Sequence, residues 1–143
     1  MVPDRPVWLA FHRPIWAVGL SVFGFVIGDN KTLENAARND IPPNVDLLLS
    51  GHIHTYQILA YREDLPIQIV SGHGGDDLHR TAPSDPVGAV IGGVTVAAGR
   101  GTPGVFGFAM LEREDGGWRA TDYDIAARAL MACHLRGRKL ACD

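Results

Sequence analysis

The sequence feature that most restricts the fold is an apolar run that ends in two closely spaced histidines. The run Val45-Asp46-Leu47-Leu48-Leu49-Ser50 is followed at once by Gly51-His52-Ile53-His54. A run of this length and composition is typical of a strand buried inside a sheet. Glycine lets the backbone turn tightly where such a strand ends. The pattern therefore predicts a core strand with two imidazoles at its carboxyl end, where neutral imidazole is a good metal ligand.

A second stretch of the chain repeats this order of features. Trp8-Leu9-Ala10-Phe11 leads into His12, and Pro14 follows two residues later as a strand breaker. Ligands bind at the carboxyl ends of strands in open α/β sheets, so His12 is expected to approach His52 and His54. A metal site usually needs three or four protein ligands, and these three imidazoles are the candidates.

Length and composition are typical of one soluble globular domain. The 143 residues are 46% hydrophobic and 20% charged, with a net charge of −3, and we treat residues 1–143 as a single domain. No long basic run occurs, so neither nucleic acid nor an anionic membrane is an expected partner. No apolar stretch reaches the length of a membrane span, and residues 1–6 resemble a loop entering a strand rather than a secretory signal.

The rest of the pattern predicts mostly short strands. A helix is expected at residues 31–39, with Asn30 as its N-cap, and residues 14–28 are expected to form an irregular, partly helical loop. Strands are expected at residues 6–12, 45–50, 56–61, 67–70, 106–112 and 118–124, with one more within 88–97.

The C-terminal tail holds both cysteines, Cys133 and Cys142. Strands at about 129–135 and 138–142 would form a hairpin that brings the two cysteines together, whereas a helix up to Cys133 is the alternative. A disulfide and two reduced thiols are both compatible with the sequence.

The order of these motifs resembles the C-terminal half of calcineurin-like metallophosphoesterases, in particular the branch similar to purple acid phosphatases. The matching stretches are His12-Arg13-Pro14, Gly51-His52-Ile53-His54 and Gly72-His73-Gly74-Gly75, and Phe106-Gly107-Phe108 leads into a closing hairpin. The resemblance extends over nearly the whole chain. It implies a mostly β, α/β fold with few helices, namely half of a four-layer α/β/β/α sandwich.

The resemblance also implies a reaction and its cofactors. Enzymes of this family hydrolyse phosphate monoesters or diesters with two divalent ions, which are iron, zinc or manganese. By the resemblance, His12 and His52 bind one ion and His54 binds the other. The expected partner is a phosphate-ester substrate.

The family's N-terminal half carries Asp-x-His, Gly-Asp-x-x-Asp and Gly-Asn-His-Asp/Glu motifs, and none of them is expected in this chain. These motifs supply the bridging aspartate and the remaining ligands. The chain is therefore expected to be the C-terminal portion of such an enzyme and inactive alone. A periplasmic or secreted protein is expected if a signal peptide lies upstream, and a cytoplasmic one otherwise.

Other polar residues near these motifs have ordinary structural explanations. His73 is expected to be a surface loop histidine, with substrate contact as the alternative, and Arg13 a surface ion-pair partner, with phosphate contact as the alternative. Asp76 and Asp77 fit turn chemistry better than metal binding. The remaining expectations are that Tyr56 packs in a sheet and that His79 and His134 face solvent.

Two non-catalytic functions compete with the phosphoesterase. The chain could be a truncated domain that binds one ion weakly, or an interaction module whose histidines are structural. The geometry of the three imidazoles separates these hypotheses, because metal binding requires nitrogens within about 5 Å of one another at an open site.

Overall fold

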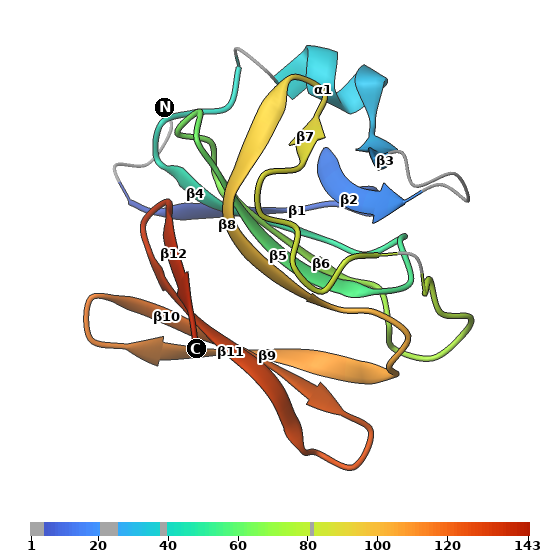
Figure 1. The fold of residues 1–143 in the computed structure, drawn as a ribbon. Helices are drawn as coiled ribbons and strands as arrows, with labels where there is room; N and C mark the ends of the chain where they lie inside the picture. Colours follow the sequence, from blue (N-terminus) through green and yellow to red (C-terminus); the bar gives the residue numbers. More distant parts are fainter. Residues whose placement is uncertain (1–4, 21–25, 38–39, 81) are drawn as a thin grey trace.

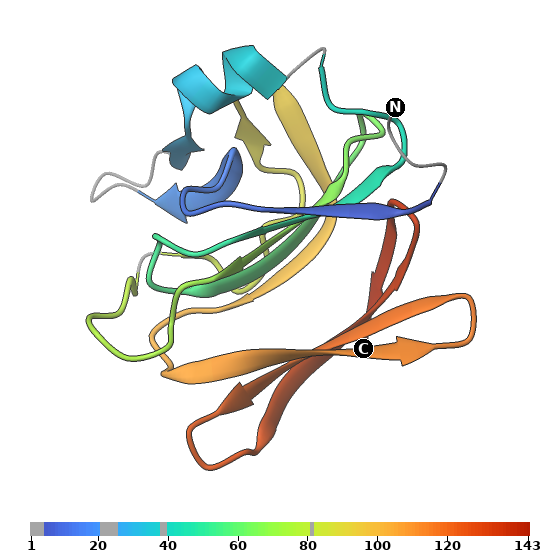
Figure 2. The same cartoon turned by 180° about the vertical axis from the view of Figure 1, so that it is seen from behind.

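The structure is a computed structural model, and it describes residues 5–20, 26–37, 40–80 and 82–143. These residues form three layers (Figures 1 and 2). A six-stranded sheet lies in the middle, a four-stranded sheet packs on one face, and a short hairpin with one helix covers the other. In chain order the elements are β1 (Val7–Ala10), β2 (Trp16–Leu20), β3 (Val26–Asp29), α1 (Lys31–Ala37), β4 (Val45–Ser50), β5 (Tyr56–Tyr61), β6 (Ile67–Ser71), β7 (Val90–Ile91), β8 (Val94–Thr102), β9 (Gly107–Glu114), β10 (Gly117–Asp124), β11 (Ala129–Arg136) and β12 (Lys139–Cys142).

The central sheet is mixed, with strand order β1-β4-β6-β5-β8-β7. Strands β1, β4 and β6 run parallel to one another, and β5 and β8 continue the sheet in antiparallel pairs. The three parallel strands therefore end at the same edge of the sheet, on the right in Figure 1. This edge is where the sequence predicts the histidine site.

Both faces of β5, and most of β4 and β6, are buried, which explains why these inner strands are largely apolar without alternation. One face of the sheet packs with the hairpin and helix layer through a core that includes Trp16, Leu48 and Leu59. The other face packs on the four-stranded sheet through a core that includes Leu47 and Ile69. The rings of Trp8 and Trp118 join the two sheets edge to face, with centroids 4.6 Å apart.

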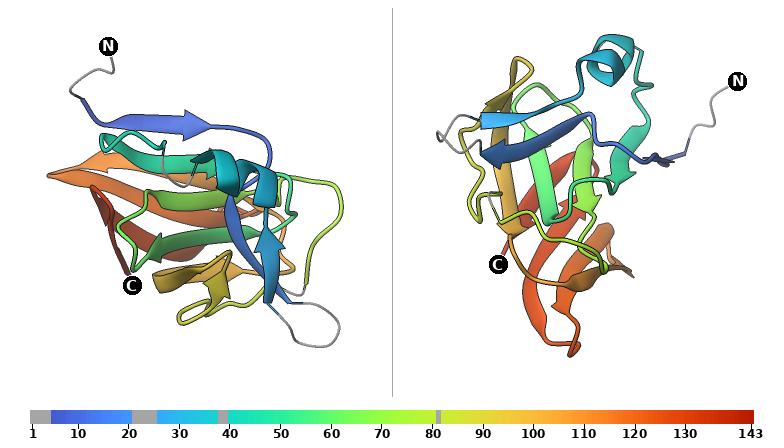
Figure 3. Two further views of the ribbon diagram at one scale, coloured as in Figure 1. Left: turned by 90° about the horizontal axis from the view of Figure 1, so that it is seen from above. Right: turned by 90° about the vertical axis from the view of Figure 1, so that its right-hand side faces the viewer.

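The prediction for residues 14–28 is wrong. The described part of this segment contains β2 and β3, which pair as an antiparallel hairpin, and residues 21–25 lie outside the described residues. Figure 3 shows the hairpin crossing the strands of the central sheet. Buried Gln57 binds it there, because its side-chain oxygen accepts a hydrogen bond from the Val18 backbone N–H at 2.9 Å. A tertiary contact thus supports strands that the glycine-rich sequence does not predict.

The helix prediction is confirmed over Lys31–Ala37, while residues 38–39 lie outside the described residues. Asn30 is its N-cap, because the Asn30 Oδ1 accepts a hydrogen bond from the Leu33 backbone N–H at 3.2 Å. The strands predicted at 45–50 and 56–61 have the observed bounds. The strand expected within 88–97 is two strands, β7 and β8, and β8 extends to Thr102. Residues 1–4, where a loop was predicted, also lie outside the described residues.

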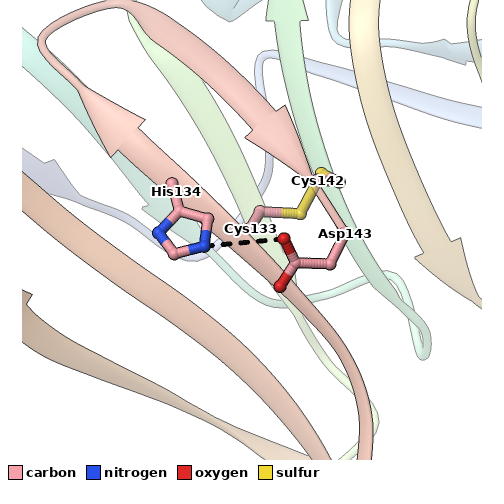
Figure 4. Close-up of a disulfide and its surroundings, with 4 residues drawn as sticks. All are labelled: Cys133, His134, Cys142 and Asp143. Carbon is pink, nitrogen blue, oxygen red and sulfur yellow. Dashed lines mark ion pairs between the residues drawn. A yellow bond between two sulfur atoms is a disulfide. The ribbon is translucent and has the colours of Figure 1, made fainter.

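The C-terminal tail forms the predicted hairpin, and the helical alternative is wrong. Strands β11 and β12 pair with Cys133 opposite Cys142, and a disulfide joins the two (Figure 4). Beside it His134 lies between two carboxylates, with Nδ1 2.7 Å from Glu114 and Nε2 3.6 Å from Asp143. His134 is half-buried, so the expectation that it faces solvent holds only in part.

The fold is mostly β with one helix among the described residues, as the coarse fold class expected. None of the described helical segments has the length and apolarity that crossing a bilayer demands.

Candidate metal centre

Three loops meet where the parallel strands end. The Gly51 N–H donates to the His12 carbonyl at 3.1 Å, which extends the pairing of β1 with β4 into the first histidine site. The Gly72 N–H donates to the Thr55 carbonyl at 3.1 Å, and the His79 N–H donates to the His54 carbonyl at 2.8 Å. The backbone therefore holds the loops after β1, β4 and β6 side by side, and each loop carries histidine.

His12 and His52 form a close pair. The Nε2 atom of His12 lies 3.0 Å from the Nδ1 atom of His52, and the ring centroids are 4.8 Å apart. Both side chains are exposed, so solvent and ions reach them. The predicted convergence of the two strand ends is thus present in the structure.

The backbone of His52 adopts a left-handed conformation, with φ of 66°. Residues other than glycine pay a steric penalty in this region, and such residues gather at functional sites. The conformation turns the chain immediately after Gly51 and directs the His52 ring toward His12. The turn that the sequence assigns to Gly51 is therefore made at the histidine itself.

The electrostatic environment favours the neutral form of His52. Loss of hydration lowers the pKa of His52 first, and the positive charge of Arg13 lowers this pKa further. Charge on the three imidazoles of His12, His54 and His79 acts in the same direction. A neutral imidazole is the form that binds a metal ion. The lowered pKa also shows that four histidines lie within electrostatic range of one another.

His54 lies beside His79 rather than in the first pair. The ring centroids of His54 and His79 are 5.7 Å apart, with an interplanar angle of 40°. His79 is exposed, as predicted, and His54 is half-buried. Among the described residues, no three His, Cys, Asp or Glu side chains converge on a single metal position. The site thus consists of two imidazole pairs, and the three predicted ligands do not form one cluster.

Gly72 allows the loops to approach this closely. A Cβ atom at position 72 would lie 2.1 Å from the Ile53 carbonyl oxygen, a separation that real side chains do not adopt. The loop after β6 therefore rests directly on the backbone of the Gly51-His52-Ile53-His54 turn. This contact explains the glycine at the start of Gly72-His73-Gly74-Gly75.

A groove of about 350 Å³ opens beside the first pair. It is lined by His52 and by two cationic side chains, Arg13 and Lys31, together with Asn30 and Thr32. Both cations are exposed. A groove with this lining is suited to an anionic ligand that also contacts His52.

His73 is not a surface histidine, so that expectation is wrong. It is fully buried, and its Nε2 lies 2.8 Å from Oδ1 of Asp122 on β10. Thr102 donates its hydroxyl to the other oxygen of Asp122. Burial first, and then the negative charge of Asp122, raise the pKa of the Tyr56 phenol well above its usual range. His73 ties the glycine-rich loop to the four-stranded sheet and does not face the histidine pairs.

Tyr56 is buried in the sheet, as predicted. Asp76 and Asp77 are exposed, and Asp77 accepts a hydrogen bond from the Leu78 N–H, which is turn chemistry as expected. Sequence reasoning did not connect His79 with His54, because it assigned His79 to solvent alone. Asp77-Leu78-His79 has the order Asp-x-His, so the expectation that the chain holds no such sequence is wrong.

Comparison with protein-family models and with curated proteins finds no match for this chain.

Proposed function

We propose that this chain supplies part of the metal centre of a metal-dependent phosphoesterase of the calcineurin-like type. In this proposal the chain is the C-terminal portion of a four-layer sandwich, and it holds its ions with His12, His52 and His54. The observation that carries the proposal is the close approach of His12 and His52 at the carboxyl ends of two parallel strands.

The separation of the two nitrogens supports shared coordination of one ion. Two imidazole nitrogens bound to one ion at about 2.1 Å lie about 3.0 Å apart at the right angle of an octahedral ion and about 3.4 Å apart at a tetrahedral ion. The observed separation between His12 Nε2 and His52 Nδ1 is 3.0 Å. The pair therefore needs little rearrangement to bind a divalent ion, and zinc, iron and manganese all accept imidazole.

The placement of His54 supports a second ion position. His54 follows His52 by two residues but lies beside His79, outside the first pair. This arrangement agrees with the division that the resemblance implies, in which His54 binds a different ion from His12 and His52. The chain's own residues would leave each ion short of ligands, so further donors must complete both positions.

The cationic groove supports a phosphate-ester substrate. Arg13 and Lys31 lie on the same groove as His52, so they can neutralise an anion held next to the imidazole pair. Divalent ions, when bound, activate a water and stabilise the negative charge that develops on the phosphoryl group. His12, His52 and His54 would contribute nitrogen ligands, and Arg13 would pair with the phosphate.

A metal-dependent hydrolysis assay tests the proposal. The chain alone, and a longer chain that includes any residues encoded in frame upstream, are assayed with p-nitrophenyl phosphate and bis-p-nitrophenyl phosphate in manganese or zinc. We expect hydrolysis by the longer chain and metal binding by both. The matched control is His134→Ala, a histidine on the four-stranded sheet whose loss should leave both quantities unchanged.

A specific observation favours one alternative, in which the histidines are structural. The contact between His12 and His52 is also a good hydrogen bond when one ring donates and the other accepts. In that case the pair would tie the loop after β1 to the loop after β4. Failure of zinc, manganese and iron to bind the chain would favour this alternative and contradict the phosphoesterase.

A further inference from the structure

We propose that His79 is a fourth imidazole of this metal centre and shares an ion with His54. The inference rests on the proposed metal site and adds a ligand that the sequence motifs do not contain. The loop after β6 would then contribute to the centre together with the loops after β1 and β4.

The backbone fixes His79 next to His54. The His79 N–H donates to the His54 carbonyl at 2.8 Å, so the backbones of the two residues lie side by side. The contact of Gly72 with Ile53 anchors the beginning of the same loop. Two contacts therefore hold His79 beside His54: one at the start of the loop, through Gly72, and one at the backbone of His79 itself.

The ring geometry is close to that of two ligands on one ion. Imidazoles that bind one tetrahedral ion at about 2.1 Å through ring nitrogens have centroids about 5.3 Å apart. The centroids of His54 and His79 are 5.7 Å apart, and those of His12 and His52 are 4.8 Å apart. The separation of the two rings is therefore compatible with a shared ion in either pair.

The nitrogens of this second pair are available. Among the described residues, the rings of His54 and His79 make no side-chain hydrogen bond, whereas carboxylates hold His73 and His134. His79 is exposed and His54 half-buried, so an ion reaches both from solvent. His73 and His134 thus differ from the four histidines at this edge of the sheet, because each is bound by a carboxylate.

Metal titration of single variants tests the inference. Zinc binding is measured by calorimetry for the wild type, His79→Ala, His79→Asp and the control His134→Ala. We expect His79→Ala to weaken one class of zinc sites by at least about tenfold, since a ligand is lost. His79→Asp should restore much of that affinity, because a carboxylate oxygen can replace the nitrogen, and His134→Ala should bind zinc as the wild type does.

A second readout identifies the ligand directly. Addition of Co²⁺ should shift and broaden the imidazole NMR signals of His54 and His79 together. Equal zinc affinity for His79→Ala and the wild type, with an unperturbed His79 signal, would overturn the inference while leaving the phosphoesterase proposal intact. No zinc or cobalt binding by the wild type would overturn both.

Discussion

At the scale of single residues, the backbone of His52 adopts a conformation that is energetically unfavourable but places its imidazole beside His12. Its φ of 66° is unfavourable for any residue with a Cβ atom, and its ring lies 3.0 Å from that of His12. A stable turn at this place would use glycine. The histidine therefore trades some stability for the placement of its imidazole.

Two substitutions at His52 separate the effect of its backbone conformation on stability from the effect of its imidazole on zinc binding. His52→Gly should be more stable than His52→Ala by about 1 kcal/mol, because glycine adopts the left-handed conformation without strain. Both variants should lose zinc affinity alike, since neither has an imidazole. Urea unfolding gives the stability and calorimetry the affinity. Equal stability of the two variants would show that the turn is not left-handed in solution.

Asp124 is a second residue whose role depends on its charge. The Arg128 backbone N–H lowers the pKa of Asp124 first, and this effect exceeds the opposing loss of hydration. The Arg128 side chain and the Ala126 N–H lower this pKa further, and these bonds close the turn between β10 and β11. A carboxyl whose pKa is lowered by folding stabilises the folded state at pH values above its pKa in the unfolded chain. This stabilisation is lost as the pH falls through the pKa of the carboxyl in the folded state.

We therefore expect Asp124→Asn to be less stable than the wild type at pH 7. The difference should shrink below about pH 4, the region where aspartate in an unfolded chain takes up its proton, and vanish once the folded carboxyl is also protonated. Urea midpoints measured from pH 7 to pH 2 check this. A difference that stays constant over this range would mean that the Asp124 charge is not what stabilises the turn.

At the scale of elements, the disulfide stabilises the C-terminal hairpin. Cys133 and Cys142 face each other across β11 and β12, and Cys133 belongs to the core between the two sheets. The bridge thus fixes β12, an edge strand of four residues, to a strand that contributes to the core. A short edge strand gains more from such a bond than an inner strand, since its other side is unpaired.

Loss of this bond should lower the free energy of unfolding by about 2–3 kcal/mol, the range expected for a loop of roughly ten residues. The double variant Cys133→Ala/Cys142→Ala, unfolded in urea, measures this loss. A reducing agent should destabilise the wild type by a similar amount and leave the double variant unchanged. Two free thiols in the native wild type, detected by mass spectrometry after alkylation, would contradict the bond.

At the scale of the whole molecule, the site depends on how the layers fix the loops. The central sheet lies between two cores, to both of which β1 and β4 contribute side chains, while β6 contributes Ile67 and Ile69 to one of them. The loops after these strands are then joined by backbone hydrogen bonds. The histidine pairs therefore lie on a rigid edge, as metal ligands need.

Zinc should accordingly stabilise the folded chain, because the unfolded chain cannot assemble the pairs. At a zinc concentration of about one hundred times Kd, the stabilisation is about 2.7 kcal/mol for one site. Thermal unfolding should shift upward by several degrees in the wild type and in His134→Ala. The double variant His12→Ala/His52→Ala should show a smaller shift, and an equal shift would place the zinc elsewhere.

The sequence by itself determined most of the strands and the first histidine pair. The apolar runs of β4 and β5 and the capping Asn30 act locally, so their patterns can be recognised residue by residue. Parallel strands end at one edge, so the approach of His12 to His52 followed from the element order.

Only the tertiary structure decided the roles of His73 and His79 and the strands within residues 14–28. His73 is buried because Asp122, 49 positions away, binds its ring, and His79 lies beside His54 through a backbone bond between two loops. The hairpin of β2 and β3 is held by Gln57 of a distant strand. Each depends on contacts between segments remote in the chain, and such contacts outweigh the weak local preferences of glycine-rich sequence.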